Sequence, residues 1–457
     1  MKSADRHLSA TEKIGYGLGD AASHIVFDNV VFYLTFFYTD IFGIPAGFVG
    51  TMFLLARALD AVSDPVMGLL ADRTRSRWGK FRPYLLWGAV PFGLLCVLTY
   101  STPQMTVPHK MIFAAVTYTA LTLAYTVVNI PYCALGGVVT SDPTQRMSLQ
   151  SYRFVLATAG GMLSTVLMLP LANWVNATDH AAGYQGAIAI LGAAAVVMFL
   201  ACFATTRERI QTDPAAHGTF VEDLRDVWHN DQWRVVGALI LLNIMGVSVR
   251  GGAMIYYVTY FLGQADAFKW FLATYCVGNL FGSALAKPLT DRVCKVSLFA
   301  WLNVALGGLS LVMFFVPPGS GGTMFALIFA IGVLHQATTP IQWVMMSDTV
   351  DYGEWKQGKR LTGVNFAGTL FVLKLGLAFG GAVVGWTLQA VAYRANAPAQ
   401  SPAVMRGILL LFTVFPGFLY LLSAWVSRAY TLRRETLSQV LADLEARRLT
   451  TSQGGIA

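Results

Sequence analysis

Charge is what this sequence has least of. Only 12% of its 457 residues are charged, whereas a soluble domain carries about 25%. Hydrophobic residues make up 55% of the chain, and residues 186–205 and 407–426 contain no charge at all. Runs of about 20 apolar residues are long enough to cross a lipid bilayer. The composition therefore excludes a soluble α/β enzyme, which alternates short apolar strands with amphipathic helices.

Several other signatures are missing. The five cysteines form no CxxC pair and lie in or beside apolar segments, so we interpret them as small core residues rather than disulfides or metal ligands. The sequence has no GxxxxGK[ST] loop, so ATP is not the expected energy source. It also has no HExxH or GxSxG motif, so hydrolysis is unsupported. We expect a protein that is not an enzyme and that needs no organic cofactor.

The apolar runs predict an all-α, polytopic membrane protein with about twelve spanning helices. We expect no cleavable signal peptide, because the first residues are polar and the first apolar run is too long for one. The expected spans are residues 14–40, 47–71, 82–101, 110–139, 150–175, 185–205, 234–263, 268–289, 296–316, 321–347, 363–391 and 403–428.

The net charge of +8 reports membrane topology. Lysine and arginine concentrate in alternate loops and in the tails, which places both termini in the cytoplasm of a multi-pass protein of the cell (inner) membrane. Nucleic-acid binding is the weaker alternative, because no basic folded domain stands apart from the spans. A monomer is the default expectation.

The longest polar interruption divides the spans into two sets of six. We predict an N-terminal bundle at 1–205, a cytoplasmic middle loop at 206–233, a C-terminal bundle at 234–429 and a cytoplasmic tail helix at 430–457. The pairs Asp72-Arg73 and Asp291-Arg292 follow the second and the eighth span, at matching places in the two halves. Duplicated halves around a midplane site are typical of secondary transporters.

Two acids lie in the second span, where each costs about 2.5–3.5 kcal/mol to insert. Asp60 and Asp64 are four residues apart and so share one helix face, with Ser63 between them. Two carboxylates in a low dielectric do not both stay ionised without a cation or a proton between them. Carboxylate and hydroxyl oxygens suit a hard cation such as Na⁺. The alternative is a structural pair with Arg57, three residues before Asp60.

The first span carries a second polar stripe. Asp20, His24 and Asp28 follow one another at steps of four and lie on one face. Such a stripe faces a cavity or another polar helix rather than lipid. The alternative is that the two acids pair with basic residues on neighbouring helices.

Other polar residues at membrane depth suit a sugar. Lys374 lies deep in the eleventh span and needs an anionic ligand or a carboxylate partner, for which Asp60 or Asp64 is a candidate. Sugar hydroxyls favour amide and charged partners, and the ring favours an aromatic face. For tyrosine and tryptophan, a place at the membrane interface is the alternative. The candidate lining residues are Tyr125, Asn129, Tyr152, Arg153, Gln342 and Trp343.

Two charged segments lie at the expected cytoplasmic ends of the halves. Each is interpreted either as a solvated loop or as part of a gate that closes with salt bridges. The candidate gate residues are Asp72, Arg73, Arg77, Lys80, Asp348, Asp351 and Glu354.

Four stretches resemble the glycoside–pentoside–hexuronide:cation symporters of the major facilitator superfamily, a group that includes the melibiose carrier. They are "EKIGYGLGD", "FFYTDIFGI", "RALDAVSDPVMGLLADRTRSRWGKFRPYLLW" and "DTVDYGEWKQGKR", beginning at Glu12, Phe36, Arg57 and Asp348. The resemblance implies that Asp60 and Asp64 take Na⁺, Li⁺ or H⁺ with help from Thr126, and that Lys374 lies beside them. It implies a sugar site near Tyr125, Asn129 and Arg153.

Two positions depart from the melibiose-type pattern, which carries acids where this chain has His24 and Asn129. The loss of two negative charges predicts a more positive cavity near Arg153 and Lys374, which would favour an anionic sugar. The functional expectation is a cation-coupled sugar symporter that works by alternating access. A lysolipid or amphiphile transporter of the same fold and a polytopic membrane enzyme are the alternatives.

Overall fold

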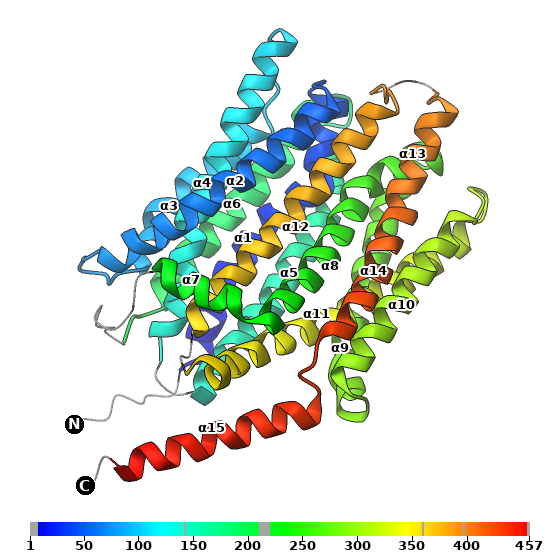
Figure 1. Ribbon diagram of the computed structural model, residues 1–457. Helices are drawn as coiled ribbons and strands as arrows, with labels where there is room; N and C mark the ends of the chain where they lie inside the picture. Colours follow the sequence, from blue (N-terminus) through cyan, green and yellow to red (C-terminus); the bar gives the residue numbers. More distant parts are fainter. Residues whose placement is uncertain are drawn as a thin grey trace. The chain divides into compact units, whose positions relative to one another are not determined.

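A computed structural model describes residues 8–140, 143–209, 220–358, 361–395, 397 and 399–454 (Figure 1). Throughout these ranges the regular structure is helical, and no strand occurs. The predicted all-α class is confirmed. Contacts divide the chain into two compact units, Met1–Ala215 with Val384–Ser401 and Ala216–Val383 with Pro402–Ala457. The domain boundaries proposed from the sequence stay a prediction.

The first unit begins with a helical run of three segments, α1, η1 and η2, and continues with five long helices. Their bounds are α1 Ala10–Asn29, η1 Val30–Leu34, η2 Phe37–Ile41, α2 Ala46–Arg73, α3 Arg82–Thr99, α4 Val107–Val138, α5 Pro143–Val175 and α6 His180–Thr205.

The second unit holds most of the remaining helices. Their bounds are α7 Phe220–His229, α8 Asp231–Tyr256, η3 Tyr257–Phe261, η4 Ala265–Ala267, α9 Phe268–Arg292, α10 Lys295–Phe314, α11 Gly321–Gln357, α12 Thr362–Ala390, α13 Pro402–Phe412, α14 Val414–Val426, η5 Ser427–Ala429 and α15 Arg434–Gly454. The last turns of α12, from Val384 onward, belong to the first unit.

Ten helices of the described chain are long and apolar enough to cross a membrane, judged by length and composition. The predicted first and eighth spans correspond to α1 and α9, which have 20 and 25 residues but are not among the ten. Charge explains the difference, because α1 carries Glu12, Asp20 and Asp28, and α9 carries Lys269 and Asp291. The polar stripe of Asp20, His24 and Asp28 therefore contributes to the low hydropathy of α1.

A single carboxylate organises the start of α3. Glu208, in the chain after α6, accepts hydrogen bonds from the backbone N–H groups of Lys80, Phe81 and Arg82 at 2.8, 2.8 and 2.9 Å. The first N–H groups of a helix have no partner within it and favour negative charge. The Arg82 side chain donates to the Phe203 carbonyl at 2.7 Å, so this helix start is fixed to the end of α6 from both sides.

The second charged segment covers residues 347–363, and its part at 347–357 is helical, so the interpretation as a solvated loop is wrong there. Residues 359 and 360 lie outside the described part of the chain. α11 runs through it to Gln357 and ends where Gly358 adopts a left-handed φ of 73°. No glycine or proline stands between Gly353 and Gly358 to stop the helix earlier. Asp348 and Thr349 are buried in this extension.

The tail forms a helix, as predicted, and packs on α11. Val440 and Leu444 are buried, whereas Leu441 is exposed. Trp355 of α11 donates a hydrogen bond to Asp443 of the tail at 2.9 Å. Packing and this bond together fix the helix to the second unit.

Glycines bring α9 and α11 into close backbone contact. A Cβ atom at Gly278 would lie 2.4 Å from the Phe329 carbonyl oxygen, and one at Gly282 would lie 2.1 Å from that of Val333. Facing them, a Cβ at Gly332 would lie 2.5 Å from the Tyr275 carbonyl oxygen. Small residues spaced by four are the usual means of such approach between membrane helices.

We therefore expect Gly282→Ala to lower the stability of the second unit. The added methyl group meets backbone rather than a movable side chain, and overpacking of this kind costs about 1–3 kcal/mol. Thermal unfolding of the detergent-purified protein measures the effect. Gly308→Ala on α10 is the matched control, because nothing lies within 4 Å of its Cβ position. Equal melting temperatures for the two variants would contradict the packing argument.

Candidate functional site

Asp60 forms a buried ion pair on its own helix. Arg57 Nη1 lies 2.7 Å from Asp60 Oδ2, and Arg57 Nη2 donates to the Tyr118 hydroxyl of α4 at 3.2 Å. Asp60 is 1% exposed and Arg57 is 9% exposed. The structural pair that the sequence offered as an alternative is thus present. A positive charge beside Asp60 thus comes from the preceding turn of α2.

Asp64 has different surroundings. Its Oδ1 accepts a hydrogen bond from the Thr126 hydroxyl of α4 at 2.8 Å, and the carboxylate is partly exposed. The neighbouring Ser63 Oγ is buried and has no hydrogen-bond partner among the described residues. A buried hydroxyl without a partner is costly. Asp64 and Thr126 therefore place a carboxylate and a hydroxyl oxygen next to one another, which are donors that a hard cation prefers.

Arg153 of α5 is neutralised by Asp20 of α1. Its Nε lies 2.8 Å from Asp20 Oδ2, and its guanidinium carbon lies 5.3 Å from the centre of the Tyr132 ring. Both charged groups are largely buried, with side chains 19% and 7% exposed. For Asp20, the alternative of a pair with a basic residue on a neighbouring helix is therefore what the structure contains. The expectation of a more positive cavity near Arg153 and Lys374 stays a prediction, and Asp20 supplies a negative charge beside the first of these residues.

His24 and Asp28 form a more open pair on the same helix. Their Nδ1 and Oδ1 atoms lie 3.4 Å apart, and their side chains are 39% and 26% exposed. A Cβ atom at Gly161 of α5 would lie 1.8 Å from Asp28 Oδ2, so only glycine leaves room for this carboxylate. On the same helix, Phe27 stacks against Tyr125 of α4, with ring centres 6.0 Å apart.

Asn129 is half-buried on α4, whereas Tyr152 of α5 is 39% exposed. The first unit thus brings residues from α1, α2, α4 and α5 into one polar region, linked by the contacts described above.

The remaining predicted lining residues belong to the second unit. Lys374 of α12 is buried, with 8% of its surface exposed. Gln342 of α11 is also buried and donates to the Leu239 carbonyl of α8 at 3.2 Å. Trp343 packs against the apolar core of this unit. One amide hydrogen bond of Gln342 is therefore already used within the protein.

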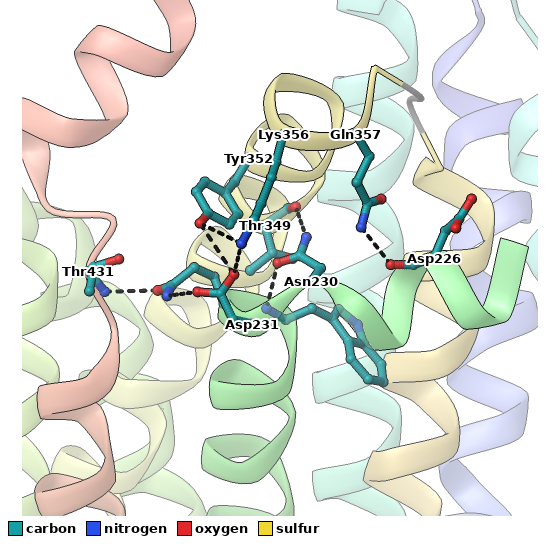
Figure 2. Close-up of polar contacts among 10 residues, drawn as sticks. Asp226, Asn230, Asp231, Thr349, Tyr352, Lys356, Gln357 and Thr431 are labelled. Atoms are coloured by element: carbon teal, nitrogen blue, oxygen red, sulfur yellow. Dashed lines mark hydrogen bonds and ion pairs between the residues drawn. The ribbon is translucent and has the colours of Figure 1, made fainter.

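The charged end of α11 is tied to other helices of its unit. Asp348 pairs with Lys295 of α10 and accepts a hydrogen bond from the Tyr430 hydroxyl at 3.0 Å. One turn further on, Asp231 of α8 lies 2.6 Å from Lys356 Nζ and accepts from the Tyr352 hydroxyl at 3.3 Å (Figure 2).

A third tie is made by Asn230, whose side chain donates to the Thr349 carbonyl at 2.8 Å (Figure 2). The sequence singled out Asp348 but not the residues that hold α11 from outside, namely Asn230, Asp231, Lys295 and Tyr430. Nothing in their spacing indicates these contacts.

The other predicted gate residues lie at the end of α2, in the segment after it, and on α11. Arg73 ends α2, and the Arg77 guanidinium lies 4.2 Å from the centre of the Trp78 ring. Lys80 uses its backbone to reach Glu208. Asp351 and Glu354 lie on α11, and the side chain of Asp72 falls outside the described part of the chain.

Sequence reasoning also missed a pair at the start of α1. Arg209 donates to both carboxylate oxygens of Glu12, at 2.6 and 2.9 Å. These hydrogen bonds raise the pKa of Arg209 above its ordinary value, so the guanidinium stays charged at any pH the protein meets. The two residues are 197 positions apart, which no local pattern reveals.

A double-mutant cycle tests the ion pair of Arg57 and Asp60. Arg57→Gln leaves a buried carboxylate without its guanidinium, so we expect a loss of about 3–5 kcal/mol. Arg57→Gln/Asp60→Asn removes both charges and should recover much of that loss. Melting temperatures of the purified variants give the coupling. Additive effects of the two changes would mean that the pair contributes nothing.

Comparison with known proteins identifies the chain. Residues 15–434 match the family described as MFS/sugar transport protein. The chain is 65% identical over 438 residues to the inner membrane symporter YicJ of Escherichia coli, with 96% of this chain and 95% of the relative covered. It is 33% identical to the isoprimeverose transporter of Lactiplantibacillus pentosus, with coverage of 95% and 91%.

Among solved structures, the chain resembles a bacterial homologue of the human lysosomal transporter Spinster, in an inward-facing and unoccupied conformation. The TM-score is 0.64 at 14% identity, covering 92% of this chain and 96% of the other. At that identity the likeness shows the fold alone. The family and the relatives consist of transporters, so the chain is not an enzyme. Together with its ten apolar helices, the match makes this chain a multi-pass inner-membrane member of the MFS/sugar transport protein family.

Proposed function

We propose that this protein is a cation-coupled symporter of a glycoside, pentoside or hexuronide, driven by Na⁺ or H⁺ and working by alternating access. The observation that carries the proposal is the contact between the Asp64 carboxylate and the Thr126 hydroxyl at 2.8 Å. Ser63, the residue before Asp64, adds a buried hydroxyl that has no hydrogen-bond partner among the described residues, and we include it in the proposed cation cluster. A cation or proton at this cluster would neutralise Asp64.

The two acids of α2 make different contacts, which suggests different roles in cation binding. Arg57 lies 2.7 Å from Asp60 and supplies a positive charge that does not come from a transported ion. Asp64 is more exposed, and its Oδ1 accepts a hydrogen bond from the Thr126 hydroxyl. We therefore assign cation binding mainly to Asp64, with Asp60 shaping the field around it. This refines the equal roles that the sequence gave them.

The sugar site is proposed beside this cluster in the first unit. Phe27 and Tyr125 offer an aromatic surface, and His24, Asp28 and Asn129 offer hydrogen-bonding groups that are not fully buried. Asp20 and Arg153 hold each other in place and present a balanced pair rather than a net charge. Gln342, Trp343 and Lys374 of the second unit stay sugar-binding residues predicted from the sequence.

Coupling needs a free-energy link between the two ligands. Filling the Asp64 cluster removes a negative charge from the first unit and thereby favours the state that binds sugar. The names of relatives support the solute class, because one is an isoprimeverose transporter and others are a glucuronide carrier homologue and a putative sulfoquinovose importer. The charged cytoplasmic segments would then act as gates, with both termini in the cytoplasm.

Asp64→Asn tests the coupling assignment. We expect gradient-driven accumulation of the transported sugar in vesicles to fall to background. The amide of asparagine carries no negative charge that a cation or a proton could neutralise. Sugar exchange without a gradient should persist. The measurement is uptake of labelled glycosides, pentosides and hexuronides under an imposed Na⁺ or H⁺ gradient.

The matched control is Asp266→Asn, which removes an exposed carboxylate from η4 of the second unit. It should accumulate sugar as the unaltered protein does. Full accumulation by Asp64→Asn would refute the assignment of coupling to this residue.

Ser63→Ala tests which oxygens hold the cation. Loss of a hydroxyl ligand that costs about 1–1.5 kcal/mol should raise the Na⁺ concentration for half-maximal stimulation roughly tenfold. Proton-driven uptake should not change, because a proton needs only the carboxylate. Unchanged Na⁺ stimulation would remove Ser63 from the cation site.

A further inference from the structure

Arg250 of α8 is a buried positive charge at a depth where charges are costly. The residue is 2% exposed and lies in an apolar helix that is a candidate membrane span. Two other arginines of the described helices face carboxylates: Arg57 faces Asp60, and Arg153 faces Asp20. None of the carboxylates in the described residues interacts with Arg250. An unbalanced charge at this depth costs at least several kcal/mol.

The contacts that Arg250 does make are all to neutral groups. Nη2 forms a short hydrogen bond to the Ser310 hydroxyl of α10, and Nε donates to the Phe412 carbonyl at 3.4 Å. The guanidinium carbon lies 5.4 Å from the centre of the Tyr420 ring. Nη1 donates no hydrogen bond to any described residue. These contacts orient the guanidinium, and one of them satisfies a carbonyl at the end of α13, but none supplies negative charge.

Hydrogen-bonding groups from two further helices lie near this charge. The positive charge of Arg250 acts on Tyr275 of α9 and on His335 of α11, whose Oη and Nδ1 atoms are 2.9 Å apart. Asn279, one turn from Tyr275, has a buried Oδ1 that finds no hydrogen-bond partner among the described residues, and Tyr420 Oη finds none in that part of the chain either. The cluster thus combines a fixed cation with a phenol, an imidazole and an amide.

We propose that Arg250, Tyr275, Asn279 and His335 form a small-anion site inside the second unit. The chemistry recognised is a carboxylate or a halide, held by charge-assisted hydrogen bonds from the guanidinium and the phenol. The anion supplies the negative charge that the helices around Arg250 lack. It comes either from solution or from a carboxylate on the transported solute. Only the second source rests on the proposed function.

The alternative is a purely structural arginine that fixes α8 to α10 and to the end of α13. A structural role predicts that stability is independent of anions. The anion site predicts that occupied protein is more stable than empty protein, by an amount that grows with ligand concentration. Anion-dependent melting of the full-length protein therefore separates the two.

The experiment measures the melting temperature of the detergent-purified protein in sodium chloride, sodium acetate, sodium glucuronate or neutral methyl glucoside. Sodium concentration and ionic strength are held constant with sodium HEPES, so that neither the cation cluster nor screening contributes. We expect at least one anion to raise the melting temperature in a saturable way. If chloride or acetate stabilises the protein, the anion comes from solution. If glucuronate is the single anion that stabilises it, the anion is the carboxylate of the transported solute. No stabilisation by any of the three anions overturns the proposal.

Three variants locate the effect. In Arg250→Gln the apparent dissociation constant of the anion should rise roughly tenfold or more, the usual loss for a hydrogen bond to a charged group. Ser310→Asp brings a carboxylate to the guanidinium from within the protein and should abolish the anion effect while the fold is retained. Arg406→Gln, an exposed arginine on α13, is the control and should behave like the unaltered protein.

Unchanged anion stabilisation in Arg250→Gln and Ser310→Asp overturns the proposal. If neither variant folds, Tyr275→Phe decides: weaker anion binding supports the site, and unchanged binding refutes it. Failure here is distinguishable from failure of the proposed function. If the protein accumulates neutral sugar but is not stabilised by anions, the proposed function stands and the anion site is refuted. If anions bind but no sugar is taken up, the anion site stands and the proposed function is refuted.

Discussion

The cost of burying charge in a medium without water governs this protein. Each ionisable group placed in an apolar helix needs a partner, and the described helices meet this need with pairs inside the helix, such as Arg57 with Asp60, or between helices, such as Arg153 with Asp20. Buried polar groups that are not part of such pairs are therefore candidates for binding a ligand. The hydroxyl of Ser63 and the guanidinium of Arg250 are both of this kind.

The same constraint links fold and function. Helix α1 is too polar to pass as an ordinary span, yet it packs extensively on α5 and α6 because its charges find partners there. Polar pairs fix which faces of α1, α2, α4 and α5 meet, and glycines such as Gly160, whose Cβ would lie 3.2 Å from the Ala21 Cα, allow the backbones to come close enough. The region that we propose to bind cation and sugar is therefore also a region that determines the packing of the first unit.

Much of the fold could be predicted because apolar length and helical period are local properties of the sequence. The face shared by Asp60 and Asp64, and the tail helix, follow from spacing alone. The pairing of acids with bases could not be predicted in this way. Asp20 is 133 positions from Arg153, and Glu208 reaches Lys80 across 128, so only the packed helices decide these partners. The extension of α11 through residues 347–357 was missed because charged residues are as compatible with a helix as with a loop.

The contacts of Glu208 also determine where the chain tolerates an insertion. One carboxylate holds three consecutive backbone N–H groups at the start of α3, from a segment that follows α6 directly. A reporter domain or protease site inserted at residues 206–209 would pull this carboxylate away and leave the first turn of α3 without its anion. Engineered fusions are better placed after the tail helix α15, because the hydrogen bonds of Glu208 do not involve that helix.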